Sequence, residues 1–270
     1  MAAIETTFFD LSYLETLANQ DTAVHRLEPR AKLVTTLIFI ITVVSFPRYE
    51  IAALLPFLSY PVVMLALANL PPGYLLKKIA LALPFAFFIG VLNPWFDRAI
   101  MLQLGPFAIS GGWLSFLSIL LRALLTVFAA LVLIATTGFP GICMALERIG
   151  VPPIFVMQLL FLYRYLFVLM DEAARLARAR ALRSFDGRGL GLKVFSSLIG
   201  HLLLRTLDRA QRIHLAMLAR GFDGEIRLAR AYQIRWREIL FVAGWTSLFI
   251  FLRSYNLPVL LGEVLTKILL

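Results

Sequence analysis

The chain lacks most of the residue patterns on which enzymes and secreted proteins depend. It has one cysteine, Cys143, so no disulfide can form within it, and only 16% of its residues are charged. Its three histidines, His25, His201 and His214, do not have the spacing of metal ligands. Neither a G-x-x-x-x-G-K-[ST] phosphate-binding loop nor an H-E-x-x-H sequence occurs. We therefore expect no directly bound cofactor, no metal site and no catalytic residues.

The N-terminal stretch also lacks the basic and apolar regions of a signal peptide. "MAAIETTFFDLSYLET" contains three acidic residues and no basic one. What the chain has in excess is apolar residues, which make up 60% of it and give a mean hydropathy of +0.84. A soluble domain does not need that much apolar surface, so we expect lipid to surround most of the chain.

Four apolar segments in the first half of the chain can each cross a membrane with the help of their flanks. They cover residues 33–46, 51–70, 79–96 and 113–137, and the connections include "PPGYLLKK" (71–78), expected to be a turn, and residues 97–112, expected to be a loop. Lys and Arg are more frequent in residues 1–32 and 71–78 than in the other connections. Because cytoplasmic loops carry the excess of basic residues, the N-terminus is predicted to be cytoplasmic.

Residues 154–170 form a further apolar segment, but its crossing would conflict with the charge distribution. Residues 171–238 contain 14 Lys and Arg against 7 Asp and Glu, and so carry most of the net charge of +10. In a membrane protein this excess favours the cytoplasmic side rather than a nucleic-acid partner. We therefore interpret 154–170 as a helix in or under the inner leaflet. Residues 239–252 are expected to cross once, and a second short crossing over 257–270 is the alternative.

Arg122 lies inside the fourth apolar segment, where a buried arginine needs a partner. No acidic residue lies within the other apolar segments, which leaves two explanations. Either a backbone carbonyl accepts its hydrogen bonds, or the helix begins later and the side chain reaches the interface. We favour the second.

The basic region contains two expected helices. Residues 171–183 are rich in Ala, Leu and Arg, which are strong helix formers. Residues 198–220 have an amphipathic pattern that ends at Gly221, where a C-cap glycine is favoured. Its apolar stripe is expected to contain Leu203, Leu207, Ala210 and Met217, with Arg205, Arg209 and Arg212 on the opposite side.

Both expected helices end in nearly the same sequence. "LRSFDG" begins at Leu182, and "ARGFDG" begins at Ala219. The first supplies Arg183, Ser184, Asp186 and Gly187, and the second supplies Arg220, Gly221, Asp223 and Gly224. One such end is typical of helix capping, in which the dipole favours a cation. The repetition indicates two equivalent binding sites on a partner, such as a homodimer.

These residues resemble the transmembrane (T) component of energy-coupling factor (ECF) transporters, in the cobalt/nickel CbiQ family. The resemblance runs nearly end to end and includes "HRLEPRAKL" from His25, "RIGVPP" from Arg148 and "LAMLARGFDGE" from Leu215. It implies an all-α polytopic membrane protein, with a bundle of about five transmembrane helices and a cytoplasmic coupling domain of amphipathic helices. We expect three domains: an N-terminal tail with the first four transmembrane helices over 1–138, cytoplasmic or inner-face coupling helices over 139–238, and a C-terminal transmembrane helix over 239–270.

In that family, Ala-Arg-small sequences at two helix ends dock onto two ATP-binding-cassette ATPase subunits. The resemblance assigns this role to Ala219, Arg220 and Gly221. The second motif is a full match, and the resemblance also assigns the role to Arg183 and Ser184, where Leu182 replaces the alanine. Supporting residues would be Asp186, Gly187, Asp223 and Gly224.

The implied function is a non-catalytic coupling subunit of a cobalt or nickel importer in the inner membrane of a bacterium or archaeon. The implied partners are two ATPase subunits that use the ATP and form a homodimer, a substrate-binding membrane subunit, a small accessory membrane subunit, and membrane lipid. Two alternatives stay open. One is a T component for another micronutrient, such as a vitamin, and the other is a basic scaffold that binds anionic lipid.

Overall fold

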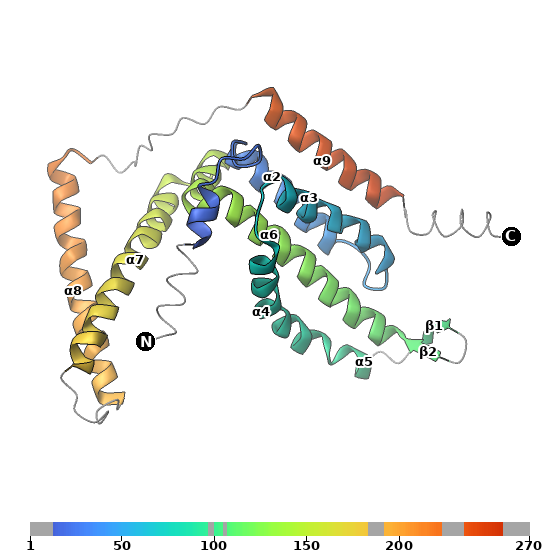
Figure 1. The fold of residues 1–270 in the computed structure, drawn as a ribbon, viewed down its shortest axis with the longest axis horizontal. Coiled ribbons are helices and arrows are strands. Elements are labelled where there is room, and N and C mark those ends of the chain that lie inside the picture. Colours follow the sequence, from blue (N-terminus) through green and yellow to red (C-terminus); the bar gives the residue numbers. More distant parts are fainter. Residues whose placement is uncertain (1–12, 97–99, 105–106, 183–191, 223–234, 256–270) are drawn as a thin grey trace. The chain divides into compact units, whose positions relative to one another are not determined.

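The structure is a computed structural model that describes residues 13–96, 100–104, 107–182, 192–222 and 235–255. These residues are almost entirely helical (Figure 1), which confirms the predicted all-α class. The chain divides into two compact units. We call Leu17–Gly138 with Tyr232–Leu270 the bundle unit, and Met1–Thr16 with Phe139–Ala231 the helix-pair unit.

The bundle unit begins with α2 (Pro29–Val44), the 3-10 helix η1 (Ala52–Leu58) and α3 (Ser59–Leu67). The apolar segment expected over 51–70 is thus split into η1 and α3. Pro56 lies inside η1, where its missing N–H and its ring disfavour a regular α-helix.

The prediction of a turn over 71–78 is wrong, because α4 (Pro72–Gly90) begins at Pro72. Proline suits the first turn of a helix, where its missing N–H would have no helical partner anyway, and the following Leu and Lys residues favour continuation. The short helix α5 (Asn93–Phe96) follows. The connection expected to be a loop contains the antiparallel strands β1 (Ile100–Leu104) and β2 (Phe107–Ser110).

The fourth apolar segment forms most of α6 (Gly111–Ile149), which is interrupted at Gly138. Gly138 has φ 70° and ψ 157°, a combination that essentially only glycine adopts. The same residue ends the first segment of the bundle unit. The interruption of α6 therefore coincides with the boundary between the two units.

Lys32 of α2 is 1% exposed, and its ammonium group donates a hydrogen bond to the Thr136 carbonyl at 2.7 Å. In an uninterrupted α-helix that carbonyl would accept a hydrogen bond from the N–H of residue 140. Residue 140 is Pro140, which has no N–H. Lys32 therefore supplies the donor that α6 lacks at its interruption.

Arg122 donates a hydrogen bond to the Pro47 carbonyl at 2.6 Å. Because α6 already begins at Gly111, the favoured explanation of a later helix start is wrong. The carbonyl alternative is the one that the structure shows.

The core of the bundle unit is an aromatic cluster that joins α2 to α9 (Trp236–Ser254). Phe39, Tyr60 and Phe249 are each at most 2% exposed. The ring centroids of Phe39 and Phe249 lie 5.4 Å apart, and those of Tyr60 and Trp245 lie 4.9 Å apart in an edge-on arrangement. Phe39 and Phe249, which are 210 positions apart in sequence, are thereby packed together.

The helix-pair unit contains the end of α6, α7 (Pro153–Ala181) and α8 (Leu192–Ala219). The expected helices 154–170 and 171–183 are one continuous helix, α7. Phe139 at the end of α6 stacks on Tyr163 of α7, with 4.7 Å between ring centroids.

Three of the described helices are long and apolar enough to cross a membrane: Pro72–Trp95, Gly111–Ile149 and Pro153–Arg180. The apolar segment Ala52–Leu67 is shorter. The side of the membrane on which each connection lies, and the crossing of 154–170, stay predictions. So does the alternative crossing over 257–270, which falls outside the described residues.

Candidate functional site: the two ends of the α7–α8 pair

The C-terminal end of α8 is closed by a Schellman motif. The Gly221 N–H donates to the Leu218 carbonyl at 3.0 Å, and the Phe222 N–H donates to the Met217 carbonyl at 3.1 Å. This pair of bonds requires a left-handed residue between them, and Gly221 has φ 76°. The prediction that Gly221 caps the helix is confirmed.

The cap presents the candidate docking residues at the surface. Ala219, Arg220 and Gly221 are all exposed. Phe222 turns back and lines the same groove as Met217, which is the apolar contact that often accompanies a Schellman motif. The backbone of this helix end is therefore fixed while the Arg220 side chain is left at the surface.

The first candidate sequence begins at the end of α7. Leu182 follows the last helical residue, its N–H donates to the Arg178 carbonyl at 3.1 Å, and its side chain is 86% exposed. The other candidate residues, Arg183, Ser184, Asp186, Gly187, Asp223 and Gly224, lie outside the described residues.

The two helix ends lie at opposite ends of an antiparallel pair (Figure 1). Met157, near the start of α7, lines the same groove as Phe222, which follows α8, whereas Leu169 lies near Thr206 farther along. α7 has 29 residues and α8 has 28, so each helix is roughly 40 Å long. Leu182 and Ala219 are thus separated by about the length of the pair.

An ion-pair network joins the two helices. Glu172 of α7 accepts hydrogen bonds from Arg205 of α8 at 2.7 Å and from Arg175 of its own helix at 3.0 Å. Arg175 also lies 3.8 Å from Asp171. The sequence signal for this contact is weak, because Glu172 is one of many charges in a basic run. The network is a specific polar contact between α7 and α8.

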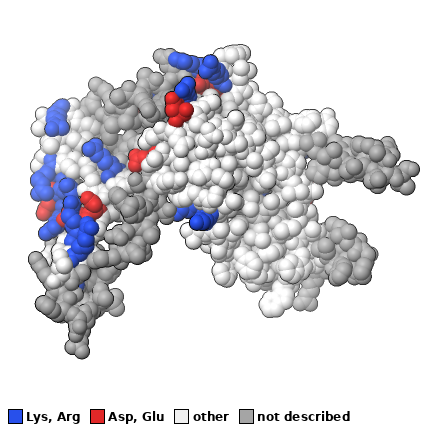
Figure 2. Space-filling model, in the orientation of Figure 1, with Lys and Arg blue, Asp and Glu red and all other residues white. Residues whose placement is uncertain are grey.

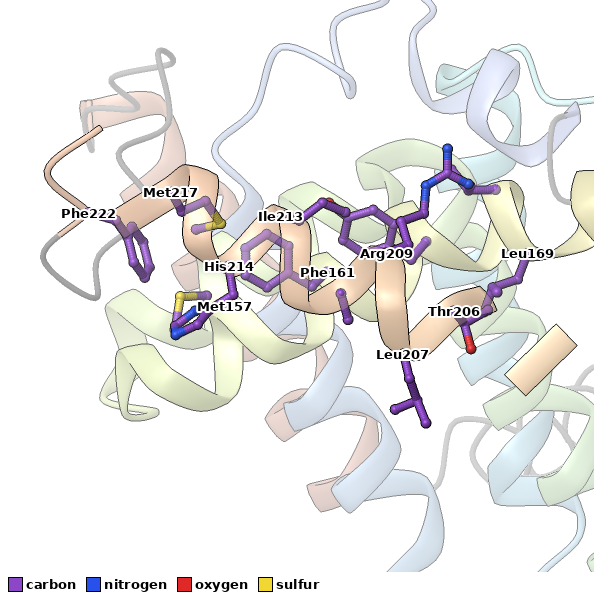
Figure 3. Close-up of a pocket in the computed structure, with 13 residues that line it drawn as sticks. Met157, Phe161, Leu169, Thr206, Leu207, Arg209, Ile213, His214, Met217 and Phe222 are labelled. Carbon is purple, nitrogen blue, oxygen red and sulfur yellow. The ribbon is translucent and has the colours of Figure 1, made fainter. Parts of the chain in front are cut away.

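An apolar groove of 520 Å³ also lies between α7 and α8 (Figure 3). Its lining is apolar or aromatic except for Thr206, Arg209 and His214. The predicted stripe of α8 is only partly right. Leu207, Ala210 and Met217 line the groove, but Leu203 does not and is 57% exposed, whereas Arg209, expected on the opposite side, does line it.

Lys and Arg side chains gather over α7 and α8, whereas most of the visible surface of the bundle unit carries neither charge (Figure 2). Among the described residues, no group of three His, Cys, Asp or Glu side chains could hold a metal ion. Together with the three apolar helices, these features define the class: an all-α membrane protein with a charged helix pair.

Comparison with known proteins identifies the family within this class. The family model described as cobalt transport protein, CbiQ, matches residues 20–231, and the chain belongs to that family. The resemblance seen in the sequence is therefore confirmed.

Relatives from several organisms are similar over much of the chain. The chain is 30% identical over 221 residues to the ECF transporter transmembrane protein EcfT of Heliobacterium modesticaldum, covering 76% of this chain and 81% of that protein. It is 31% identical over 108 residues to the cobalt transport protein CbiQ of Salmonella typhimurium, covering 40% and 48%. An uncharacterized protein of Methanocaldococcus jannaschii is 26% identical over 226 residues, covering 80% and 77%.

Proposed function

We propose that this chain is the non-catalytic, energy-coupling subunit of an ATP-driven importer whose substrate is the cobalt ion, with nickel as the closest alternative. Its partners are two ATP-binding-cassette ATPase subunits and a substrate-binding membrane subunit. The family description and the name of the Salmonella relative support cobalt, whereas the EcfT relatives leave a vitamin or another micronutrient open.

The observation that carries this proposal is the position of the repeated sequence. Each copy begins at the C-terminal end of one helix of an antiparallel pair, at Leu182 and at Ala219. Two similar helix ends separated by roughly 40 Å can reach two copies of one partner, which helix capping alone does not explain.

In the proposed mechanism, Arg183 and Arg220 form charge-assisted hydrogen bonds with carboxylates or carbonyls of the two ATPases. Ser184 and Gly221 allow the partner's surface to approach closely. When ATP binding draws the ATPases together, the two ends move with them, and the α7–α8 pair passes the movement to the membrane subunits.

The test is the double charge reversal Arg183→Glu with Arg220→Glu. The chain is co-expressed with the ATPase and substrate-binding subunits of the same genome, and both ATPase co-purification and uptake of radioactive cobalt are measured. We expect the double variant to lose both.

The matched control is Arg178→Glu with Arg237→Glu, which makes the same change in net charge at two exposed arginines that do not line the groove between α7 and α8. It should retain both ATPase co-purification and uptake. If the two double variants lose ATPase binding equally, the chain acts by charge alone, as a lipid-binding scaffold would, and the coupling proposal is wrong.

The ion is tested separately, by competition. Nonradioactive cobalt should suppress uptake at a lower concentration than nickel, and vitamins should have no effect. If only a vitamin suppresses uptake, the proposal that cobalt is the substrate is wrong, but the proposed coupling role is unaffected.

A further inference from the structure

The apolar groove between α7 and α8 adjoins a second, polar pocket of 320 Å³. The two cavities share Leu169, Thr206 and Arg209. We call the groove and the polar pocket together the combined site. The groove forms its apolar part, and the polar pocket forms its charged part. This division between apolar and charged parts is that of an amphipathic ligand.

The polar pocket has more positive than negative charge available to a ligand. It is lined by Arg205, Arg209 and Arg212 together with Glu172 and Asp208. Arg205 is engaged by Glu172 at 2.7 Å. Arg209 and Arg212 are exposed, and neither forms a salt bridge with another residue in the part of the chain that the structure describes.

We propose that this combined site binds one anionic phospholipid, with an acyl chain in the groove and the phosphate between Arg209 and Arg212. The groove follows α7 from Met157 to Leu169, within a helix that is apolar enough to lie in a membrane. The charged pocket begins where that apolar run ends, at Leu169 and Glu172. The site thus offers an apolar surface for an acyl chain beside a charged one for a headgroup, and two guanidinium groups, set against the one remaining carboxylate of Asp208, favour a headgroup with net negative charge.

This inference goes beyond the proposed function, because it concerns neither the ATPases nor the ion. It also links the lipid to the end of α8. Met217 and Phe222, whose backbones form the Schellman cap, line the far end of the groove (Figure 3). A chain in the groove packs against both and holds the helix end that presents Arg220.

The experiment measures lipid binding to the full-length chain in detergent by native mass spectrometry. The probes are dioleoyl-phosphatidylglycerol and dioleoyl-phosphatidylcholine, which have the same chains and different headgroup charge. We expect tighter binding of phosphatidylglycerol. Arg209→Gln should weaken it about fivefold, the factor expected for losing one arginine near anionic lipid. Arg178→Gln, an exposed arginine of α7 that lines neither cavity, is the control and should leave it unchanged.

A second pair of variants tests the groove without changing charge. Ala210→Phe fills the groove and should weaken binding of both lipids, whereas Ala216→Phe, at an exposed alanine of the same helix outside the lining, should not. Equal binding of the two lipids, equal losses in Arg209→Gln and Arg178→Gln, or full binding by Ala210→Phe would each overturn the proposal. ATPase co-purification is measured in parallel, so failure here is distinguishable from failure of the coupling role.

Discussion

The aromatic core of the bundle unit and the contact between α7 and α8 are two different ways of packing apolar helices. In the bundle unit, rings from α2, η1, α3 and α9 are almost completely buried by one another. On α8, Leu203, Leu204 and Leu207 are each more than half exposed, and the contact with α7 depends on an ion-pair network and the edges of a groove. The rings of this core therefore supply their own packing partners, whereas the contact between α7 and α8 leaves apolar surface for lipid or other chains, as does the outer surface of the bundle unit, where Leu81 and Phe85 are at least 75% exposed.

The largest expected effect distinguishes the buried aromatic residues of the bundle unit from the exposed leucines of α8. Phe249→Ala, in the aromatic core, should lower the free energy of unfolding by about 3–5 kcal/mol. Leu204→Ala, at a leucine that is 62% exposed, should change it by less than about 0.5 kcal/mol. Denaturant unfolding of both variants in one detergent checks the comparison. Similar losses would mean that the exposed leucines of α8 are buried in the folded monomer.

Lys32 tests the link between α2 and the interruption of α6. Lys32→Met keeps the length of the side chain but leaves the Thr136 carbonyl without its donor, which should cost about 1–3 kcal/mol of stability. Lys77→Met, at an exposed lysine of α4, is the control and should be close to neutral. The same unfolding measurement applies, and a neutral Lys32→Met would show that the carbonyl has another donor.

Alanine substitutions at Gly221, which caps α8, and at Gly200, inside α8, should change the stability of this helix in opposite directions. Gly221→Ala forces a side chain into a left-handed conformation at φ 76° and should cost about 1 kcal/mol. Gly200 is helical with open space around it, so Gly200→Ala should stabilise the helix by about 1 kcal/mol. Amide hydrogen exchange over 213–222 reports both changes, and faster exchange in Gly200→Ala would contradict this account.

The smallest expected effect concerns the ion pair that joins α7 to α8. Glu172→Gln removes the carboxylate that accepts from Arg205 and Arg175, and should increase amide exchange in α8 near Arg205. Because an exposed ion pair is screened by salt, the difference from the unchanged chain should shrink at high ionic strength. A difference that is independent of salt would mean that the side chain packs rather than pairs.

The sequence predicts what depends on neighbouring residues and misses what depends on distant ones. Gly221 was predictable because a Schellman cap is a local structure with a strong glycine preference. The start of α4 was missed, although Pro72 carried a local signal, because the two lysines of "PPGYLLKK" also suited a connection on the cytoplasmic side.

The contacts of Arg122, Lys32 and Glu172 show the other limit. Each of these side chains meets a group that is 33 to 104 residues away in sequence, namely Pro47, Thr136 and Arg205. Burial of a charge predicts that it needs a partner but does not say which one. The stripe of α8 was misplaced for the same reason: a helix with leucines on several sides needs its packing partner, α7, to define which side is inside.

The Schellman cap also limits how α8 can change in length. Because an α-helix turns by about 100° per residue, one alanine inserted between Arg205 and Ala219 would rotate the capped end by that angle about the helix axis. Met217 and Phe222 would leave the groove, and Arg220 would point in a new direction, while the Glu172–Arg205 contact stayed in place. A seven-residue insertion would restore the direction to within about 20° but would move the end about 10 Å along the axis. The number of residues between the contact with α7 and the cap therefore sets both the reach and the rotational orientation of this helix end.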